Sequence, residues 1–282
     1  MVPRISVIIP TCDRPHMLEE ALDSVQAQTY TDKEVLVVSN GWQELPKHLP
    51  HNFESVKFMC IPPRSGPGVA RNWGAMHANG EYLAFLDDDD LWPAEFLEKM
   101  LDCAETHNAD LTAAPQHLFG KRQDIIRPSI PDAANNLSEW REIGYSGSNV
   151  LIRRDSFWCA GGYPTTLITG EDRGLLMNFL RKNMKIRICE DTFARLRKHN
   201  EGQLTDTATL MLGKLGFMTE YRDDIPAKDL KEERFAFLVH LSREWRWPVW
   251  IVGVFTAPAA CWRRCRKRLL LLKNRLFSPR RR

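Results

Sequence analysis

Four consecutive aspartates, Asp87 to Asp90, follow a short apolar run at residues 82–86. The run predicts a buried strand, and ligands of open α/β sheets bind at the carboxyl ends of strands, where these carboxylates would lie. Four adjacent negative charges repel one another. A hard cation such as Mg²⁺ removes that conflict, since it takes carboxylate and phosphate oxygens as ligands. The alternative is a solvated acidic turn that opens the next helix. The pattern favours a metal–phosphate site.

The elements that position this run alternate between strand and helix. The predicted strands lie at 5–9, 34–38, 56–61, 82–86, 148–153 and 185–189. The predicted helices lie at 18–25, 69–76, 96–104 and 172–181. This rhythm predicts an α/β fold, with a mostly parallel twisted sheet flanked by helices. The polar, proline-containing segment 115–145 is predicted to be a loop or irregular excursion, and the chain beyond about residue 201 is predicted to be helical.

The charge of the chain is divided unevenly. Residues 263–282 carry ten basic side chains and no acidic one, whereas residues 1–262 carry 36 acidic and 29 basic side chains. Such a basic tail is typical of a contact with an anionic surface, either membrane or nucleic acid. Seven scattered cysteines without a CxxC pair favour a reducing compartment and argue against a disulfide scaffold or a zinc site.

The segment before the basic tail favours the membrane. Residues 247–262 are uncharged, carry tryptophans near both ends and contain two prolines. Sixteen residues fall short of the roughly 20 that a spanning helix needs. Apolar and aromatic residues beside a basic cluster are typical of an interfacial anchor on anionic lipid. The alternative is a hydrophobic helix docked on the domain. Nucleic acid is not expected as a partner, because the aromatic residues are not interleaved with the basic ones.

Five short motifs, in one order, resemble the inverting family 2 glycosyltransferases, which have the GT-A fold. The motifs are SVIIPTCDRP at 6–15, ALDSVQAQTY at 21–30, GPGVARN at 66–72, FLDDDD at 85–90 and GED at 170–172. The resemblance covers roughly residues 4–200. It implies a donor that is a sugar attached to a nucleoside diphosphate, and a divalent Mg²⁺ or Mn²⁺ ion that stabilises the leaving diphosphate.

The resemblance implies roles on the donor side. The expected nucleotide-binding residues are Pro10, Thr11, Asp13, Asn40, Arg71, Asp87 and Asp88, and the expected metal-binding residues are Asp87, Asp89 and His199. Arg71 would add a cation on the phosphates, its alternative being a surface helix cation. Asp88 would face the nucleotide or only shape the turn, and Asp90 would only open the following helix. His199 has a structural alternative, as lone histidines often do.

On the acceptor side, the resemblance implies that Asp172 is the base that removes the proton of the acceptor hydroxyl. A carboxylate at this position could also be only a helix cap. Glu171 and Trp92 are expected to contact the acceptor. One departure concerns residues 39–40, where the family usually has two aspartates and this chain has Ser39-Asn40. Asn40 keeps an acceptor oxygen and gains a donor, so the nucleotide is left open, with UDP as the default.

The expected organisation is a catalytic GT-A domain at 1–204, a helical extension at 205–246 and a membrane-associating tail at 247–282. The expected function is metal-dependent transfer of a sugar to a glycan or lipid-linked acceptor in cell-surface polysaccharide, lipopolysaccharide or capsule synthesis. The expected location is cytoplasmic, peripheral on the cytoplasmic face of the inner membrane. Two alternatives stay open: a sugar-phosphate nucleotidyltransferase, and a non-catalytic membrane-bound scaffold of the same fold.

Overall fold

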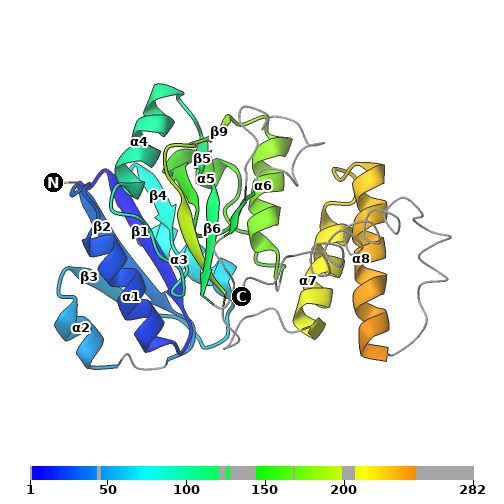
Figure 1. Ribbon diagram of the computed structural model, residues 1–282, viewed down its shortest axis with the longest axis horizontal. Helices are drawn as coiled ribbons and strands as arrows, with labels where there is room; N and C mark the ends of the chain where they lie inside the picture. Colours follow the sequence, from blue (N-terminus) through cyan, green and yellow to red (C-terminus); the bar gives the residue numbers. More distant parts are fainter. Residues whose placement is uncertain are drawn as a thin grey trace, which may run out of the picture. The chain divides into compact units, whose positions relative to one another are not determined.

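The computed structural model describes residues 2–42, 46–120, 125–127, 144–167, 169–198 and 207–245. The chain divides into two compact units, residues 1–203 and 204–282. The first unit holds the sheet and all five motifs, and the second holds two helices (Figure 1).

The first unit is built on a seven-stranded sheet. Its strands, in spatial order, are β3 (Val56–Cys60), β2 (Lys33–Ser39), β1 (Ile5–Thr11), β4 (Tyr82–Phe85), β8 (Val150–Arg153), β5 (Leu111–Ala113) and β9 (Ile186–Ile188). Neighbouring strands run parallel except at β8, which is antiparallel to both β4 and β5. The predicted α/β class with a mostly parallel sheet is therefore confirmed.

Helices cover both faces of this sheet, as the buried β-branched strands require. The helices are α1 (Pro15–Gln26), α2 (His48–Asn52), α3 (Pro67–His77), α4 (Phe96–Thr106), α5 (Arg154–Cys159) and α6 (Glu171–Arg181). Ile5, Val7 and Ile9 alternate along β1 and share one core with α1 and α4. On the other face, Ile8 meets α3 at Gly74, where a Cβ would lie 2.5 Å from its side chain.

The order of strands brings the motifs to one edge. In β1 and β4, Ile8 pairs with Phe85, the last residue of β4, and the acidic run continues beside the end of β1, where Thr11 Oγ1 donates to Asp88 Oδ2 over 2.6 Å. The loop after β2 joins them, because the backbone N–H of Asn40 donates to the carbonyl of Thr11 over 2.9 Å. This edge is the carboxyl end of the central strands, where ligands of such sheets bind.

Part of the segment predicted to be irregular is a strand pair. A second sheet has the order β10 (Ala194–Lys198), β6 (Gln116–Gly120) and β7 (Ile125–Arg127). The prediction of a loop at 115–145 is wrong for β6 and β7. Both strands are short, and β6 pairs with a strand more than 70 residues later in the chain, so no local pattern marks them. Residues 128–143 lie outside the described residues.

The second unit contains α7 (Thr207–Glu220) and α8 (Ala227–Trp245), as the prediction of a helical C-terminal part requires. Phe217, Tyr221 and Phe235 are buried, and the rings of the first two lie 5.1 Å apart. No helix among the described residues is long and apolar enough to cross a membrane. The predicted membrane-associating segment, 247–282, lies outside the described residues.

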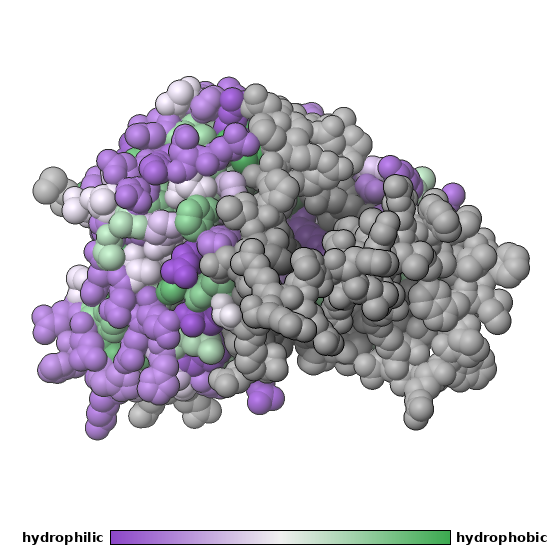
Figure 2. Space-filling model, in the orientation of Figure 1, coloured by the Kyte–Doolittle hydropathy of each residue, from purple (hydrophilic) through white to green (hydrophobic). Residues whose placement is uncertain are grey.

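The visible face of the first unit is mostly hydrophilic where it is described, with hydrophobic side chains in small separate spots (Figure 2). Scattered exposed apolar residues are ordinary on a folded domain. The chemistry of this unit therefore has to be sought in its polar clusters, and the densest of these is at the carboxyl edge of β1 and β4.

Candidate active site

The four aspartates divide into two buried and two half-exposed side chains. Asp88 and Asp90 are buried, whereas Asp87 and Asp89 keep 30% and 15% of their side chains exposed. The run forms a turn, in which the backbone N–H of Asp90 donates to the carbonyl of Asp87 over 3.1 Å, and this turn directs Asp88 and Asp90 into the protein. The run therefore presents only every second carboxylate to a ligand.

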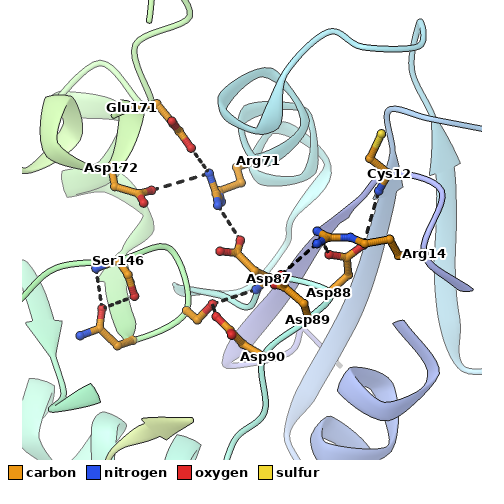
Figure 3. Close-up of polar contacts among 12 residues, drawn as sticks. Cys12, Arg14, Arg71, Asp87, Asp88, Asp89, Asp90, Ser146, Glu171 and Asp172 are labelled. Atoms are coloured by element: carbon orange, nitrogen blue, oxygen red, sulfur yellow. Dashed lines mark hydrogen bonds and ion pairs between the residues drawn. The ribbon is translucent and has the colours of Figure 1, made fainter. Parts of the chain in front are cut away.

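Asp88 is held by the loop after β1 (Figure 3). Thr11 Oγ1 donates to Asp88 Oδ2 over 2.6 Å, and the guanidinium of Arg14 pairs with both oxygens. Burial raises the pKa of Asp88 to about 6, against the lowering effect of Arg14. Both oxygens are engaged, so Asp88 joins the acidic run to the loop after β1, and its expected contact with the nucleotide stays a prediction.

Asp90 fixes the other side of the run. Its carboxylate accepts a hydrogen bond from Ser148 Oγ over 2.5 Å and one from the backbone N–H of Arg197 over 2.8 Å. Ser148 Oγ also accepts from the backbone N–H of Asp87 over 3.0 Å. The expectation that Asp90 only opens the next helix is wrong, because α4 begins at Phe96 and Asp90 instead ties the run to β8 and β10.

A divalent cation fits the two half-exposed carboxylates. Ligand oxygens of Asp87, Asp89 and Asp90 lie within 4.8 Å of one another. Such oxygens suit Mg²⁺ or Mn²⁺. Because Asp90 already accepts two hydrogen bonds, Asp87 and Asp89 are the better ligands. Arg14 Nη1 lies 2.9 Å from Asp89 Oδ2, so a cationic side chain already partly neutralises this position.

A buried arginine joins the acidic run to the start of α6. Arg71, in the GPGVARN motif on α3, is only 3% exposed. Its Nη2 donates to Asp87 Oδ1 over 2.5 Å and its Nη1 donates to Glu171 Oε1 over 2.8 Å. Nη1 also lies 3.7 Å from Asp172 Oδ1 (Figure 3). Three carboxylates from two distant segments therefore surround one guanidinium.

This position changes the expected role of two residues. The surface-cation alternative for Arg71 is wrong, because its guanidinium is 3% exposed and bonded to two carboxylates, whereas its expected contact with the donor phosphates stays a prediction. Glu171 was expected to contact the acceptor, yet its side chain is 8% exposed and paired with Arg71. The ion pair between them joins α3 to α6 on the buried side of the site.

Asp172 has the properties of a general base. It is the second residue of α6, which begins directly after Gly170, whose φ of 85° is a left-handed conformation that favours glycine. Burial raises the pKa of Asp172 to about 7, with the negative charge of Glu171 adding to the shift and Arg71 opposing it. Its side chain keeps 27% of its area exposed. A carboxylate that titrates near neutrality and reaches solvent can accept a proton from a substrate.

The comparison with known families decides the interpretation of this edge. Residues 6–161 match the model of Glycosyl transferase family 2. The chain belongs to this family.

Relatives of known name agree with this assignment. AglE, a glycosyltransferase of Haloferax volcanii, is 27% identical over 187 residues, which are 61% of this chain and 59% of that protein. The GalNAc(5)-diNAcBac-PP-undecaprenol beta-1,3-glucosyltransferase of Campylobacter jejuni is 35% identical over 94 residues, 32% of this chain and 30% of that protein. The chain spans about half the length, or less, of the curated relatives it matches.

A solved structure shows the fold. The mannosyltransferase PcManGT of Pyrobaculum calidifontis, solved in complex with GDP-Man and Mn²⁺, superposes with a TM-score of 0.62 at 20% identity. The alignment covers 96% of this chain and 81% of that one. The first unit therefore has the GT-A fold that the motif order predicts.

In this family 2 chain, the residues expected on the nucleotide lie near one another at the ends of β1 and β2. Asp13 adopts a φ of 57° and packs against Gly41, where a Cβ would lie 2.5 Å from its carboxylate. Asn40 is 6% exposed, and its Oδ1 has no hydrogen-bond partner among the described residues. Pro10 is buried within β1, so only its backbone borders the loop. Asn40 offers an unused acceptor to a nucleotide base.

Two further residues expected in the site are Trp92, on the acceptor, and His199, on the metal. Trp92 is 4% exposed, its ring stacks on Phe96 at 4.6 Å, and its Nε1 donates to the carbonyl of Ser148 over 2.7 Å. It packs the core and supports the acidic run, so its position gives an acceptor no exposed ring face. His199 lies outside the described residues.

Sequence reasoning missed the side-chain contacts of Arg14 and Ser148 with the acidic run. Both act through partners more than 50 residues away, which no local pattern reveals. The one available signal was a lone cation, Arg14, in the loop after the first strand, because a cluster of four aspartates needs a positive neighbour.

Proposed function

We propose that this chain is a metal-dependent inverting glycosyltransferase that moves a sugar from a nucleoside diphosphate donor to a hydroxyl of a glycan or lipid-linked acceptor. The observation that carries the proposal is the arrangement around Arg71, where the half-exposed Asp87 and Asp172 meet the same guanidinium. One of these carboxylates belongs to the acidic run and the other to a residue with a pKa near 7. The two halves of a transfer reaction would therefore be adjacent.

On the donor side, Asp87 and Asp89 would hold Mg²⁺ or Mn²⁺, which when bound supplies positive charge to the departing diphosphate. Asp88 and Asp90 keep these two carboxylates in place through Arg14 and Ser148. The nucleotide would lie beyond them, over the loops after β1 and β2, with its base near Asn40. The unpaired Oδ1 of Asn40 would accept an N–H of that base.

On the acceptor side, Asp172 would remove the proton of the attacking hydroxyl. The acceptor oxygen forms a bond to the anomeric carbon while the bond from that carbon to the diphosphate oxygen breaks, and the electron pair leaves with the nucleoside diphosphate. The proton passes to the carboxylate of Asp172. Attack from the side opposite the leaving group inverts the anomeric centre, and a single base is then enough.

The acceptor is proposed to be a lipid-linked or membrane-surface glycan. The name of the Campylobacter jejuni relative includes undecaprenol, a lipid carrier, which supports an acceptor of this class. The composition of residues 247–282 supports attachment to the cytoplasmic face of a membrane. Deleting 247–282 should release the protein from membrane fractions, while Asp223→Asn, at an exposed position of the second unit, should not. Unchanged fractionation of the deletion variant would refute the anchor.

The reaction is tested with a panel of nucleotide sugars and Mn²⁺. A donor that binds the native protein raises its thermal stability, which identifies the nucleotide and the sugar. Hydrolysis and transfer of that donor are then measured with and without EDTA. Metal-dependent activity is expected. Absence of donor binding and of hydrolysis for the whole panel would favour the non-catalytic scaffold instead.

The base is tested by Asp172→Asn, which should abolish transfer and leave donor binding intact. Asp102→Asn on the exposed side of α4 is the matched control, and we expect it to transfer like the wild type. Wild-type transfer by the Asp172 variant would remove Asp172 from the mechanism. Formation of a nucleotide sugar from a sugar phosphate and a nucleoside triphosphate would point to the nucleotidyltransferase class.

A further inference from the structure

Strand β10 holds the second half of the acidic run. Arg197 Nε donates to the backbone carbonyl of Asp89 over 2.9 Å, and the backbone N–H of Arg197 donates to Asp90 Oδ1 over 2.8 Å. Two residues earlier in β10, the backbone of Arg195 forms a bridge with Leu91 through two hydrogen bonds of 3.0 and 2.9 Å. Strand β10 therefore contacts residues 89, 90 and 91 in succession. Among these contacts, the one with Asp89 is made by a side chain of β10, and the others by its backbone.

The carbonyl of Asp89 lies outside the hydrogen bond of the turn. That bond joins the carbonyl of Asp87 to the N–H of Asp90 over 3.1 Å, and Asp89 is the third residue of the turn. The peptide group between Asp89 and Asp90 is thus bonded at both ends, through its N–H to Asp87 and through its carbonyl to Arg197. Its orientation sets the direction in which the side chain of Asp89 leaves the backbone, and so the place of that carboxylate beside Asp87.

The guanidinium of Arg197 is itself fixed by two further elements. Its Nη2 pairs with Glu20 of α1, and its Cζ lies 4.7 Å from the centre of the Phe119 ring of β6. The side chain of Arg197 is 19% exposed. Arg195 lies over the same ring at 4.6 Å. An ion pair at one end and an aromatic ring on one face keep Nε directed at Asp89.

We propose that Arg197 is a positioning residue for the metal ligand Asp89, because its Nε–H holds the carbonyl of Asp89 and thereby sets its carboxylate beside that of Asp87 for Mg²⁺ or Mn²⁺. This role rests on the proposed function, which puts the divalent ion at these two carboxylates. A carboxylate on a fixed backbone loses less freedom when an ion binds, so the ion binds more tightly. The positive charge of Arg197 acts in the opposite direction, since it repels a nearby cation. The two effects therefore differ in sign and can be separated by substitution.

Glutamine and methionine at position 197 separate the hydrogen bond from the charge. Glutamine carries an N–H at the same number of bonds from Cα as arginine Nε, whereas methionine carries a methyl group there. Both substitutions remove the charge and the ion pair with Glu20. Mn²⁺ binding by the resting protein, measured by electron paramagnetic resonance of the free ion, should be about two- to tenfold weaker in Arg197→Met than in Arg197→Gln, which corresponds to one lost hydrogen bond. Equal affinities of the two variants would overturn the proposal.

Arg195→Met is the matched control. It also removes a positive charge and a guanidinium that lies over Phe119, but within the described residues the side chain of Arg195 makes no contact with the acidic run. It should bind Mn²⁺ like the wild type. If Arg195→Met weakens binding as much as Arg197→Met does, the effect comes from the second sheet as a whole, and the assignment to Arg197 is wrong.

Hydrogen exchange tests the same contact without a metal. The N–H of Asp90 belongs to the peptide group that Arg197 holds, so it should exchange faster in Arg197→Met than in Arg197→Gln or the wild type. Equal exchange in all three proteins would overturn the positioning role. If the wild type binds no Mn²⁺, the proposed metal-dependent function has failed, and the exchange measurement still decides whether Arg197 holds the turn.

Transfer gives the last measurement. The Mn²⁺ concentration that gives half of the maximal rate should rise in Arg197→Met by the same factor as the dissociation constant, while kcat at saturating Mn²⁺ stays close to that of the wild type. A lower kcat with an unchanged Mn²⁺ requirement would show that Arg197 acts on something other than the metal ligand, and would overturn the proposal.

Discussion

Replacing Arg71 by lysine tests whether one guanidinium holds the two halves of the site together. Arg71 reaches Asp87 with one terminal nitrogen and Glu171 with the other, over 2.5 and 2.8 Å. A lysine keeps the positive charge but ends in a single nitrogen, so it cannot bridge two carboxylates in this geometry. The variant therefore separates the effect of charge from the effect of bridging.

The cost follows from burial. Arg71 and Glu171 are 3% and 8% exposed, so the lost bond is not screened by solvent. Losing a buried hydrogen bond to a charged group costs about 1.5–3 kcal/mol, and complete removal of one partner of a buried ion pair costs about 3–5 kcal/mol. For a domain of about 200 residues, 1 kcal/mol lowers the melting temperature by about 2–4 °C. Arg71→Lys should therefore melt roughly 3–12 °C lower than the wild type.

The assay is thermal and urea unfolding of Arg71→Lys, Glu171→Gln and the double variant. Because the two residues share one bond, the double variant should be less destabilised than the sum of the single variants. Transfer by Arg71→Lys should also fall, since Asp87 and Asp172 lose their common support. Arg222→Lys, an exposed position in the second unit, is the control. A melting temperature within about 1 °C of the wild type would refute the bridging role, because it corresponds to well under 1 kcal/mol.

Four further predictions concern other properties of the site. The activity of the wild type, as kcat/KM, should rise through about pH 7 and level off above it, because Asp172 must be ionised to act as a base; a flat profile would contradict this. The raised pKa of Asp172 means that the native state binds more protons than the unfolded chain between about pH 4 and 7, so the stabilisation by Asp172→Asn should grow across that window; a constant difference in melting temperature would contradict the shift. Arg14→Gln should tighten Mn²⁺ binding in calorimetry, since it removes a cation 2.9 Å from Asp89; weaker binding would show that Arg14 organises the site instead. Gly147→Ala should lower both stability and transfer, because its Cβ would lie 2.6 Å from Arg71 Nη2; wild-type behaviour would mean that this loop moves freely.

The strands of the first sheet could be predicted because their signal is local. Runs such as residues 5–9 and 82–86 are continuously apolar, as strands buried on both faces are, and they form β1 and β4. The metal-binding potential of Asp87 and Asp89 was equally visible, because repulsion among adjacent carboxylates depends only on sequence. Features that depend only on neighbouring residues in the sequence are therefore found again in the structure.

Contacts between distant segments could not be predicted in this way. The ion pair of Arg71 with Glu171 joins residues 100 positions apart, so the sequence alone left the arginine as a surface or phosphate-binding cation. Trp92 follows the acidic run and was expected on the acceptor, yet its contact with Ser148 turns it into the core. The strand β6 became visible only through its pairing with β10. In each case the role depends on a contact with a residue or strand distant in the sequence, and only the fold brings the two together.

The acidic run shows how a chain can carry four adjacent negative charges without unfolding. The turn at residues 87–90 directs Asp88 and Asp90 inward, and each meets its own set of donors. The remaining two carboxylates stay partly exposed, and each pairs with a protein cation, Asp87 with Arg71 and Asp89 with Arg14. Neither arginine spans both carboxylates, so the space between Asp87 and Asp89 is where added positive charge relieves the most repulsion. In the proposed reaction a divalent ion with a diphosphate would supply that charge, and metal binding would then be coupled to donor binding.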